Sequence, residues 1–248
     1  MSFNFLVISA GMQKSGTGYL YRLIDELLQA GGNPSAQQVK VDYHFEKLMQ
    51  GDNQTVGRLF VWKLVRLSAT ARRAGAFAVK THSGPTPGAW LFSRSGWIKI
   101  IYSYRDPRDA LLSGMDHGRR IAAKGKEHTF DEMVEFEYAL RVVSRWLRIW
   151  RLYQLVPGIL QVRYEDLMTD PLGQLGRIET YLGLSVSLAK KQEILWKYSK
   201  DNPQGQREGM HFNKAATQRY RQELTAEQIA RLNEIFGVYL SRMGYDRN

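Results

Sequence analysis

The sequence predicts an α/β fold in which helices cover both faces of one parallel sheet. Short apolar runs rich in β-forming residues occur at Phe3–Ala10, Ala76–Lys80, Trp97–Tyr104 and Ile159–Tyr164. Segments with the spacing of amphipathic helices lie between these runs. Strands that alternate with helices favour a parallel sheet, because a crossover connection returns the chain to the same end of the sheet.

The expected helices follow from hydrophobic spacing and from residues that start or stop helices. Ser15 is predicted to cap a first helix that runs to about Gln29, before the turn-forming cluster at Gly31–Pro34. Pro107 is expected to open another helix, because proline fits the first helical turn. Further helices are predicted over residues 56–73, 131–155, 171–182, 189–198 and 226–243.

Two segments are predicted to be loops. Residues 83–88 are rich in glycine and proline, and residues 114–126 carry basic residues among glycines. The basic loop is interpreted either as a solvated segment or as a gate over a substrate. Trp146 and Trp150 share a helix face with valines and are expected in the core. No repeat or long linker divides the chain, so we expect one domain over residues 1–248.

The composition limits the possible partners and location. A formal net charge of +11 favours anionic partners such as nucleotides, nucleic acid, acidic glycans or a membrane surface. The absence of cysteine excludes disulfides and thiolate metal sites. The N-terminal apolar run lacks the basic start of a signal peptide, and no stretch approaches the ~20 apolar residues of a membrane span. We therefore expect a cytoplasmic protein.

A glycine-rich segment between the first strand and the first helix predicts a phosphate site. Residues 11–19 read Gly-Met-Gln-Lys-Ser-Gly-Thr-Gly-Tyr. Glycines let the backbone approach an anion, and the first N–H groups of a helix point at it. Lys14 adds a charge, and the hydroxyls of Ser15 and Thr17 add donors. The plain alternative is a glycine-rich turn that only packs.

This segment differs from the phosphate loop of ATP-dependent kinases. In that pattern a lysine directly follows the last glycine, whereas Lys14 precedes Gly16. The third predicted strand ends in Arg105 rather than in an acid that could hold Mg²⁺. A nucleotide kinase is therefore an alternative of lower rank. A basic nucleic-acid-binding protein ranks third, because the sequence contains no recognised nucleic-acid motif.

Three motifs in a fixed order resemble those of the sulfotransferases that use 3′-phosphoadenosine 5′-phosphosulfate (PAPS). The first is Lys-Ser-Gly-Thr at 14–17, after a strand. The second runs from Ile101 to Ser113 and places an arginine and a serine eight positions apart. The third is Tyr-Glu-Asp at 164–166. The resemblance implies a P-loop-like α/β fold and PAPS as donor, without a metal, and it combines features of the cytosolic and glycan-modifying branches.

The resemblance also implies which residues bind the donor. Lys14 to Tyr19 would hold the 5′-phosphosulfate, and Arg105 with Ser113 would bind the 3′-phosphate, where an arginine offers a charged fork. Tyr19 would stack on the adenine, and Tyr164 would reach it from another side. The full predicted set is Lys14, Ser15, Gly16, Thr17, Gly18, Tyr19, Arg105, Ser113, Tyr164, Arg207 and Gly209.

Arg207 and Gly209 belong to that set through a weaker match. Arg207-Glu208-Gly209 resembles an Arg-Lys-Gly element that closes over the 3′-phosphate in the family. Glu208 stands where the family has lysine, and the Gly-Asp-Trp that follows in cytosolic relatives is missing here.

The resemblance further implies the catalytic groups. Lys80-Thr81-His82 ends the second strand, where the cytosolic branch places its catalytic histidine. His82 would take the acceptor proton, Lys14 would stabilise the departing phosphate, and Lys80 would assist. The glycan-modifying branch uses an acid after the first helix, so Asp42 or Glu46 is the alternative base.

The expected reaction is sulfuryl transfer to a hydroxyl or amine by in-line displacement. A small molecule, a lipid or a glycan could be the acceptor, and the sequence does not choose among them or set the oligomeric state.

Overall fold

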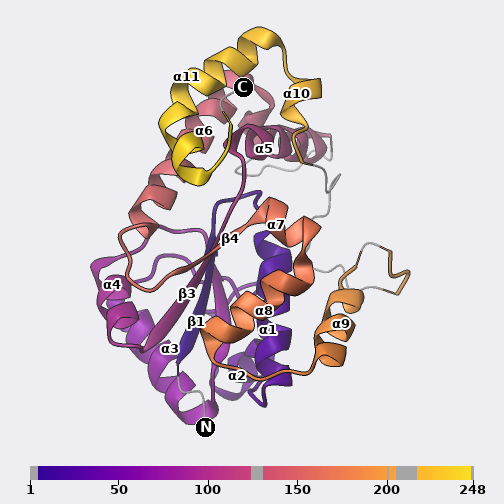
Figure 1. Ribbon diagram of the computed structural model, residues 1–248. Coiled ribbons are helices and arrows are strands. Elements are labelled where there is room, and N and C mark those ends of the chain that lie inside the picture. Colours follow the sequence, from indigo (N-terminus) through magenta and orange to yellow (C-terminus); the bar gives the residue numbers. More distant parts are fainter. Residues whose placement is uncertain (1–4, 124–130, 200, 205–216, 247–248) are drawn as a thin grey trace.

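The computed structural model describes residues 5–123, 131–199, 201–204 and 217–246, and these residues form an α/β fold. Its centre is a parallel sheet of four strands in the order β2-β1-β3-β4 (Figure 1). The strands are β1 (Leu6–Gly11), β2 (Phe77–Thr81), β3 (Ile98–Tyr104) and β4 (Leu160–Arg163). All four predicted strands are confirmed, with boundaries shifted by one or two residues where the structure describes them.

The central strands are mostly apolar because helices cover both of their faces. All six residues of β1 are buried, whereas β4 at the sheet edge is only partly buried. A strand buried on both faces reads as a continuous apolar run instead of an alternating one. The run at Leu6–Ala10 therefore identifies the centre of the sheet.

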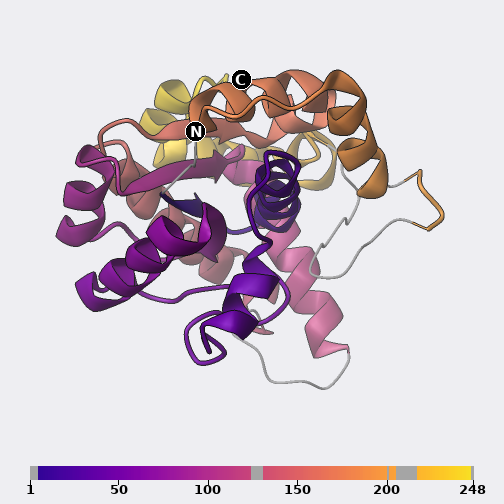
Figure 2. The same cartoon turned by 90° about the horizontal axis from the view of Figure 1, so that it is seen from below.

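Helices form one layer on each face of the sheet. Figures 1 and 2 show α3 (Val61–Ala74) and α4 (Pro87–Arg94) on one face. The other face carries α1 (Thr17–Ala30), α8 (Pro171–Leu182) and α9 (Leu188–Lys197), with α2 (Ala36–Asp42) near β2.

A third group of helices lies beyond the carboxyl ends of the strands, at the top of Figure 1. It contains α5, α10, α11 and the first half of α6, which then runs down towards α4. Trp146 and Trp150 on α6 are buried, as predicted. The bounds are α5 (Pro107–Ala122), a 3₁₀ turn (Asp131–Val134), α6 (Phe136–Tyr153), α7 (Tyr164–Thr169), α10 (Tyr220–Glu223) and α11 (Ala226–Met243).

The structure corrects the predicted helix over residues 56–73. Helix α3 begins only at Val61, because the residues before it run along the exposed edge of β2. The Val56 N–H donates to the Lys80 carbonyl (2.8 Å), and the Lys80 N–H donates to the Gln54 carbonyl (3.2 Å). An edge strand offers unpaired backbone groups, and this segment satisfies them.

The predicted basic loop over residues 114–126 is also wrong for its first part. Helix α5 continues to Ala122, and Gly114 and Gly118 are buried within it. A Cβ atom on Gly114 would lie 2.5 Å from the Met133 methyl carbon, so this glycine allows close packing and does not form a turn. Residues 124–126 lie outside the described residues.

Helices long and apolar enough to cross a bilayer do not occur in the part of the chain that the structure describes.

Candidate active site

The register of the sheet brings the segments that follow its strands to one edge. Gly11 at the end of β1 lies beside Ser103 of β3, and Ala10 lies beside Thr81 at the end of β2. Ligands of open parallel sheets bind outside the carboxyl ends of the strands. The segments that begin there are the turn at residues 12–19, His82, Arg105 and Tyr164, so four of the predicted site segments begin at this edge.

The turn between β1 and α1 has a backbone shape that suits an anion. A Cβ atom on Gly11 would lie 2.2 Å from the Ser103 hydroxyl oxygen and 2.6 Å from the Thr17 methyl carbon, so a larger residue would clash with both side chains. Lys14 and Gly16 both have left-handed backbones, with φ of 65° and 71°. At a non-glycine residue such as Lys14 this conformation costs roughly 1–3 kcal/mol. Successive N–H groups in such turns form a concave anion site.

Ser15 shapes this turn from the inside. Its Oγ donates to the Met12 carbonyl (2.6 Å) and lies 2.9 Å from the Ser103 Oγ, and the residue is fully buried. Gly16 takes the position before α1 and makes no side-chain capping bond. The predicted Ser15 cap is therefore wrong, because the hydroxyl is bonded to the end of β3.

The start of α1 supplies backbone donors to the same turn. The Leu20 N–H donates to the Gly16 carbonyl (3.0 Å), which is the first hydrogen bond of α1, and the backbone N–H groups of the first turn point out of this end of the helix. The first turn of α1 contains no acidic side chain that would compete for them. Together with the helix dipole, these groups favour a phosphate or sulfate oxygen at this end.

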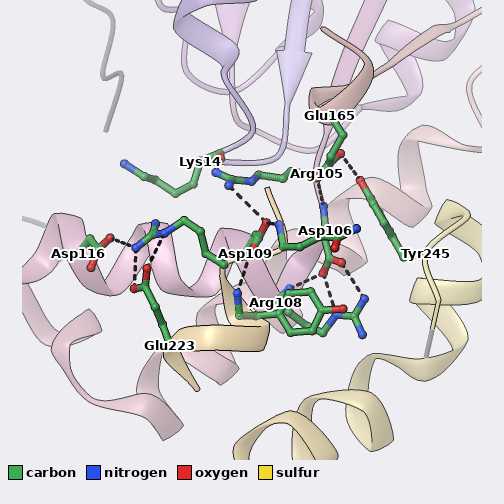
Figure 3. A network of polar contacts seen from close by, with 12 residues as sticks. Lys14, Arg105, Asp106, Arg108, Asp109, Asp116, Glu165, Glu223 and Tyr245 are labelled. Atoms are coloured by element: carbon green, nitrogen blue, oxygen red, sulfur yellow. Dashed lines mark hydrogen bonds and ion pairs between the residues drawn. The ribbon is translucent and has the colours of Figure 1, made fainter. Parts of the chain in front are cut away.

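Arg105 lies directly beside the turn and is 5% exposed. Its Nη1 donates to the Lys14 carbonyl (3.4 Å), and its Nη2 lies 3.5 Å from Asp109 Oδ2 (Figure 3). The guanidinium lies 4.3 Å above the centre of the Tyr164 ring. A Cβ atom on Gly16 would lie 2.8 Å from that ring, so Tyr164 is packed between Gly16 and Arg105. One contact chain therefore joins the glycine turn, Tyr164 and Arg105.

Asp109 connects Arg105 to the C-terminal part of the chain. It is fully buried and accepts hydrogen bonds from the N–H groups of Gln218 (2.6 Å) and Tyr220 (3.1 Å). Burial raises the pKa of the Asp109 carboxyl, and the Arg105 charge and these backbone donors oppose part of that rise. The carboxylate thus fixes both the arginine and the segment before α10.

A second layer of contacts holds the start of α5 in place. Asp106 caps the helix by accepting from the Arg108 N–H (2.9 Å), and its other oxygen pairs with Arg108 Nη2 (2.7 Å). Arg108 Nη1 also donates to Asn233 Oδ1 on α11 (2.9 Å). The Asp106 N–H donates to Glu165 Oε1 (3.2 Å), and Tyr245 donates to Glu165 Oε2 (2.7 Å). These bonds orient the turn that carries Arg105 (Figure 3).

Several cations lie close together at the carboxyl edge of the sheet. Burial and, to a lesser extent, the Arg120 and Arg105 charges lower the pKa of the Lys14 ammonium to about 8, against a smaller opposite effect of Asp116. Burial likewise lowers the pKa of Lys80 to about 8. Charges of one sign with little solvent around them are unfavourable until an opposite charge joins them. The site is therefore electrostatically suited to a polyanionic ligand.

His82 has the protonation state of a general base. Its Nδ1 lies 3.0 Å from the Gly11 carbonyl, which can only accept, so Nδ1 carries the proton and Nε2 the lone pair. Burial lowers the pKa of His82 to about 4, and the Lys80 and Lys14 charges contribute to the shift. Ser83 follows His82, and its carbonyl accepts a hydrogen bond from the Tyr153 hydroxyl (2.9 Å). This bond holds the loop that carries the His82 imidazole.

The alternative bases lie outside this network. Asp42 ends α2 and is exposed, and it accepts a hydrogen bond from Gln38 Nε2 (2.6 Å). Glu46 is exposed in the turn that follows. Within the described ranges, neither carboxylate has a hydrogen bond or ion pair with the residues around His82.

The remaining predicted donor residues are placed only in part. Ser113 is buried on α5, two turns after Asp106. Arg207 and Gly209 lie outside the described residues.

A cavity of about 470 Å³ opens beside the start of α1. Tyr19 lines it, and burial raises the pKa of this phenol to about 12, so the hydroxyl stays neutral. The other walls come from α7, α8, α9 and the segment after α9, and include Leu167, Met168, Pro171, Leu195, Trp196, Tyr198, Ser199 and Asp201.

Two site features were missed by the sequence analysis. Asp109 stands four residues after Arg105 in a helix, a spacing that indicates an ion pair, but no role was predicted for it. Arg120 was read as part of a loop, whereas its place on α5 brings its charge near Lys14.

Comparisons with known proteins identify the family of the chain. The sequence profile of the Sulfotransferase domain family matches residues 6–244. A 3-alpha-hydroxysteroid sulfotransferase from Cavia porcellus is 28% identical over 109 residues, 42% of this chain and 38% of that protein. An amine sulfotransferase from Oryctolagus cuniculus is 27% identical over 159 residues, 56% of this chain and 53% of that protein. The matches thus span about half or less of these curated relatives.

A solved structure has the same fold. Retinol dehydratase in complex with androsterone and the inactive cofactor PAP superposes with a TM-score of 0.58 at 17% identity. The match covers 97% of this chain and 81% of that protein. PAP is adenosine 3′,5′-bisphosphate, the product that remains when PAPS loses its sulfuryl group.

Proposed function

Because the chain belongs to the Sulfotransferase domain family, we propose that it transfers a sulfuryl group from PAPS to a hydroxyl or amine acceptor. One observation carries the proposal: two candidate anion sites lie side by side and are joined by a hydrogen bond. The glycine turn with Lys14 is one, Arg105 is the other, and Arg105 donates to the Lys14 carbonyl (3.4 Å). PAPS carries its two phosphate groups on one ribose, so it suits a pair of neighbouring sites. The kinase alternative is not favoured, because the family and the curated relatives are sulfotransferases.

The donor orientation follows from these two sites. We assign the 5′-phosphosulfate to Lys14 and the N–H groups of Thr17 to Tyr19, and the 3′-phosphate to Arg105 and Ser113. The cavity beside Tyr19 then receives the adenine, because its aromatic walls offer stacking surfaces. Tyr164 is packed under Arg105, so we assign it the role of positioning that guanidinium.

The reaction requires a base and a group that stabilises the leaving phosphate. His82 Nε2 takes the acceptor proton while the acceptor oxygen or nitrogen bonds to sulfur. The bond between sulfur and the 5′-phosphate oxygen breaks with its electron pair, and Lys14 stabilises the charge that develops on that oxygen. The products are PAP and the sulfated acceptor, with the proton on His82. Lys80 assists as a nearby cation, and Ser113 is proposed to restrain Lys14 before the acceptor binds.

We propose that residues 1–248 act as one sulfotransferase domain, that the transfer needs no metal, and that the protein works in the cytoplasm. The deciding experiment is PAPS turnover across small alcohols, phenols, amines, lipids and glycans, with mass detection of a product heavier by one SO₃ group. EDTA should leave the rate unchanged. Absence of PAP release and of any sulfated product with every acceptor class, together with Mg²⁺-dependent ATP consumption, would overturn the proposal.

A further inference from the structure

A surface formed by α3, α4 and the end of α6 exposes many large apolar side chains. We call it the α3–α4–α6 face. Trp62 on α3 is 56% exposed, Leu91 on α4 is 59% exposed and Leu155 after α6 is 69% exposed. Scattered exposed apolar residues are ordinary, but a contiguous group marks an interaction surface. The face consists of Phe60, Val61, Trp62, Val65, Trp90, Leu91, Leu152 and Leu155.

Contacts between the three helices show that these side chains form one surface. A Cβ atom on Gly88 of α4 would lie 2.8 Å from a methyl carbon of Val61 on α3. The Trp90 indole N–H donates to the Leu155 carbonyl (3.1 Å), and Ser93 donates to the Pro157 carbonyl (2.9 Å). Figure 1 shows α3, α4 and the lower part of α6 on the same side of the sheet.

The charges on this face have one sign. No acidic residue occurs between Asp52 and Asp106, or between Glu137 and Glu165, which covers α3, α4 and most of α6. Cations interleave with the exposed rings: Lys63 Nζ lies 5.6 Å from the Trp62 ring centre. The exposed or half-buried lysines and arginines on α3, α4, α6 and the segment before α3 are Arg58, Lys63, Arg66, Arg72, Arg73, Arg94, Arg141, Arg145, Arg148 and Arg151.

We propose that the α3–α4–α6 face docks on an anionic lipid bilayer. Helices with Trp, Phe and Leu beside Lys and Arg lie in the interface, with the apolar groups in the acyl boundary and the cations on the headgroups. A polyanion such as nucleic acid would match the cations but would leave Leu91 and Leu155 unmatched. A second copy of this chain would bring like charges together.

The docked orientation places the proposed base near the bilayer. Thr86, four residues after His82, donates to the Leu59 carbonyl next to Phe60 (2.7 Å). Tyr153, between Leu152 and Leu155, donates to the Ser83 carbonyl (2.9 Å). The loop after His82 is therefore bonded to the elements of the face on both sides. An acceptor dissolved in the bilayer would reach the site along this loop. This path rests on the proposed function, whereas docking on the bilayer does not depend on it.

The test is flotation of the full chain with vesicles of phosphatidylcholine alone or with 30% phosphatidylglycerol. We expect at least tenfold stronger partition onto the anionic vesicles, weakened by salt. The charge variant Lys63→Glu/Arg94→Glu and the apolar variant Trp62→Ser/Leu91→Ser should each lose at least tenfold. The control variant Val238→Ser/Arg242→Glu alters an exposed apolar residue and an exposed cation on α11 and should partition as the parent chain does.

Two readouts separate docking from misfolding and from plain charge attraction. Circular dichroism melting should show every variant folded, and brominated lipids should quench the parent fluorescence, with less quenching in Trp62→Phe. The proposal is overturned if the parent chain ignores anionic vesicles or if the control variant loses as much as the face variants. It is also overturned if the apolar variant keeps full binding while the charge variant loses it, a pattern that a polyanion-binding surface would give with heparin or oligonucleotides.

Discussion

Replacement of Arg105 separates recognition of the 3′-phosphate from the rest of donor binding. The guanidinium is 5% exposed and is fixed by Asp109, the Lys14 carbonyl and the Tyr164 ring. A fixed guanidinium loses little conformational entropy when it binds a phosphate. Arg105→Ala should therefore weaken PAP, which has the 3′-phosphate, far more than adenosine 5′-monophosphate, which lacks it.

The size of the loss follows from the contacts. A hydrogen bond to a charged group contributes about 1.5–3 kcal/mol, and the guanidinium can offer two to one phosphate. We expect PAP to lose about 3–6 kcal/mol, or roughly 150- to 20,000-fold in affinity. Arg105 affects binding of the monophosphate only indirectly, through its long hydrogen bond to the Lys14 carbonyl (3.4 Å). The binding free energy of the monophosphate should therefore fall by less than about 1 kcal/mol. Arg105→Lys keeps the positive charge but lacks the forked guanidinium, so its PAP affinity should lie between those of the parent chain and Arg105→Ala.

Isothermal titration calorimetry with both nucleotides measures the two losses. Arg119→Ala is the matched control, because Arg119 lies on α5 with 58% of its side chain exposed, and it should bind PAP as the parent chain does. The melting temperature of Arg105→Ala must also be followed, because the variant leaves the buried Asp109 without its cation. Equal losses for the two nucleotides in a folded variant would refute the assignment of Arg105 to the 3′-phosphate.

The remaining predictions concern the reacting groups. Lys14→Ala should lower kcat about 100-fold at saturating PAPS, since its charge matters most in the transition state; a raised KM with normal kcat would reduce Lys14 to a binding role. His82→Ala should abolish transfer with PAP affinity within about twofold, whereas Asp42→Asn and Glu46→Gln stay active; the reverse pattern would move the base to the acidic segment. The pKa values of Lys14 and Lys80, about 8, lie below the ordinary lysine value, and a bound anion raises both. PAP binding at pH 8.5 should therefore take up protons, measured by calorimetry in buffers of different ionisation heat, and proton release would contradict the cation cluster.

The sequence predicted the parts of the site that depend on strand ends. Each site segment begins within a few residues of a strand end, and strands buried on both faces give an unmistakable apolar run. Ser15 was misjudged because serine before a helix is a common cap. Its hydroxyl is instead bonded to the Met12 carbonyl and to Ser103, which is 88 residues away, and no local pattern reports a contact of that separation.

Helices α2 and α4 were not predicted, although each begins with a residue that commonly caps a helix. Ser35 accepts a hydrogen bond from the Gln38 N–H at the start of α2, and Thr86 accepts one from the Ala89 N–H at the start of α4. Thr86-Pro87 reads as a turn by composition, but it is also a cap followed by a proline at the first helical position. Whether a helix or only a turn forms after Thr86 depends on the packing of α4 against α3 and β3, which the sequence alone does not report.

The contacts of Asp109 bear on the prediction for Arg207 and Gly209. Asp201, before that segment, lines the cavity assigned to the adenine, and Gln218, after it, donates its N–H to Asp109 (2.6 Å) beside Arg105. The described residues on the two sides of that segment therefore lie at the cavity and beside Arg105. Loss of the Asp109 carboxylate would release both residues 218–220 and Arg105. Asp109→Asn keeps the size and one acceptor oxygen but removes the charge that faces Arg105, so it separates anchoring of the backbone from orientation of the arginine.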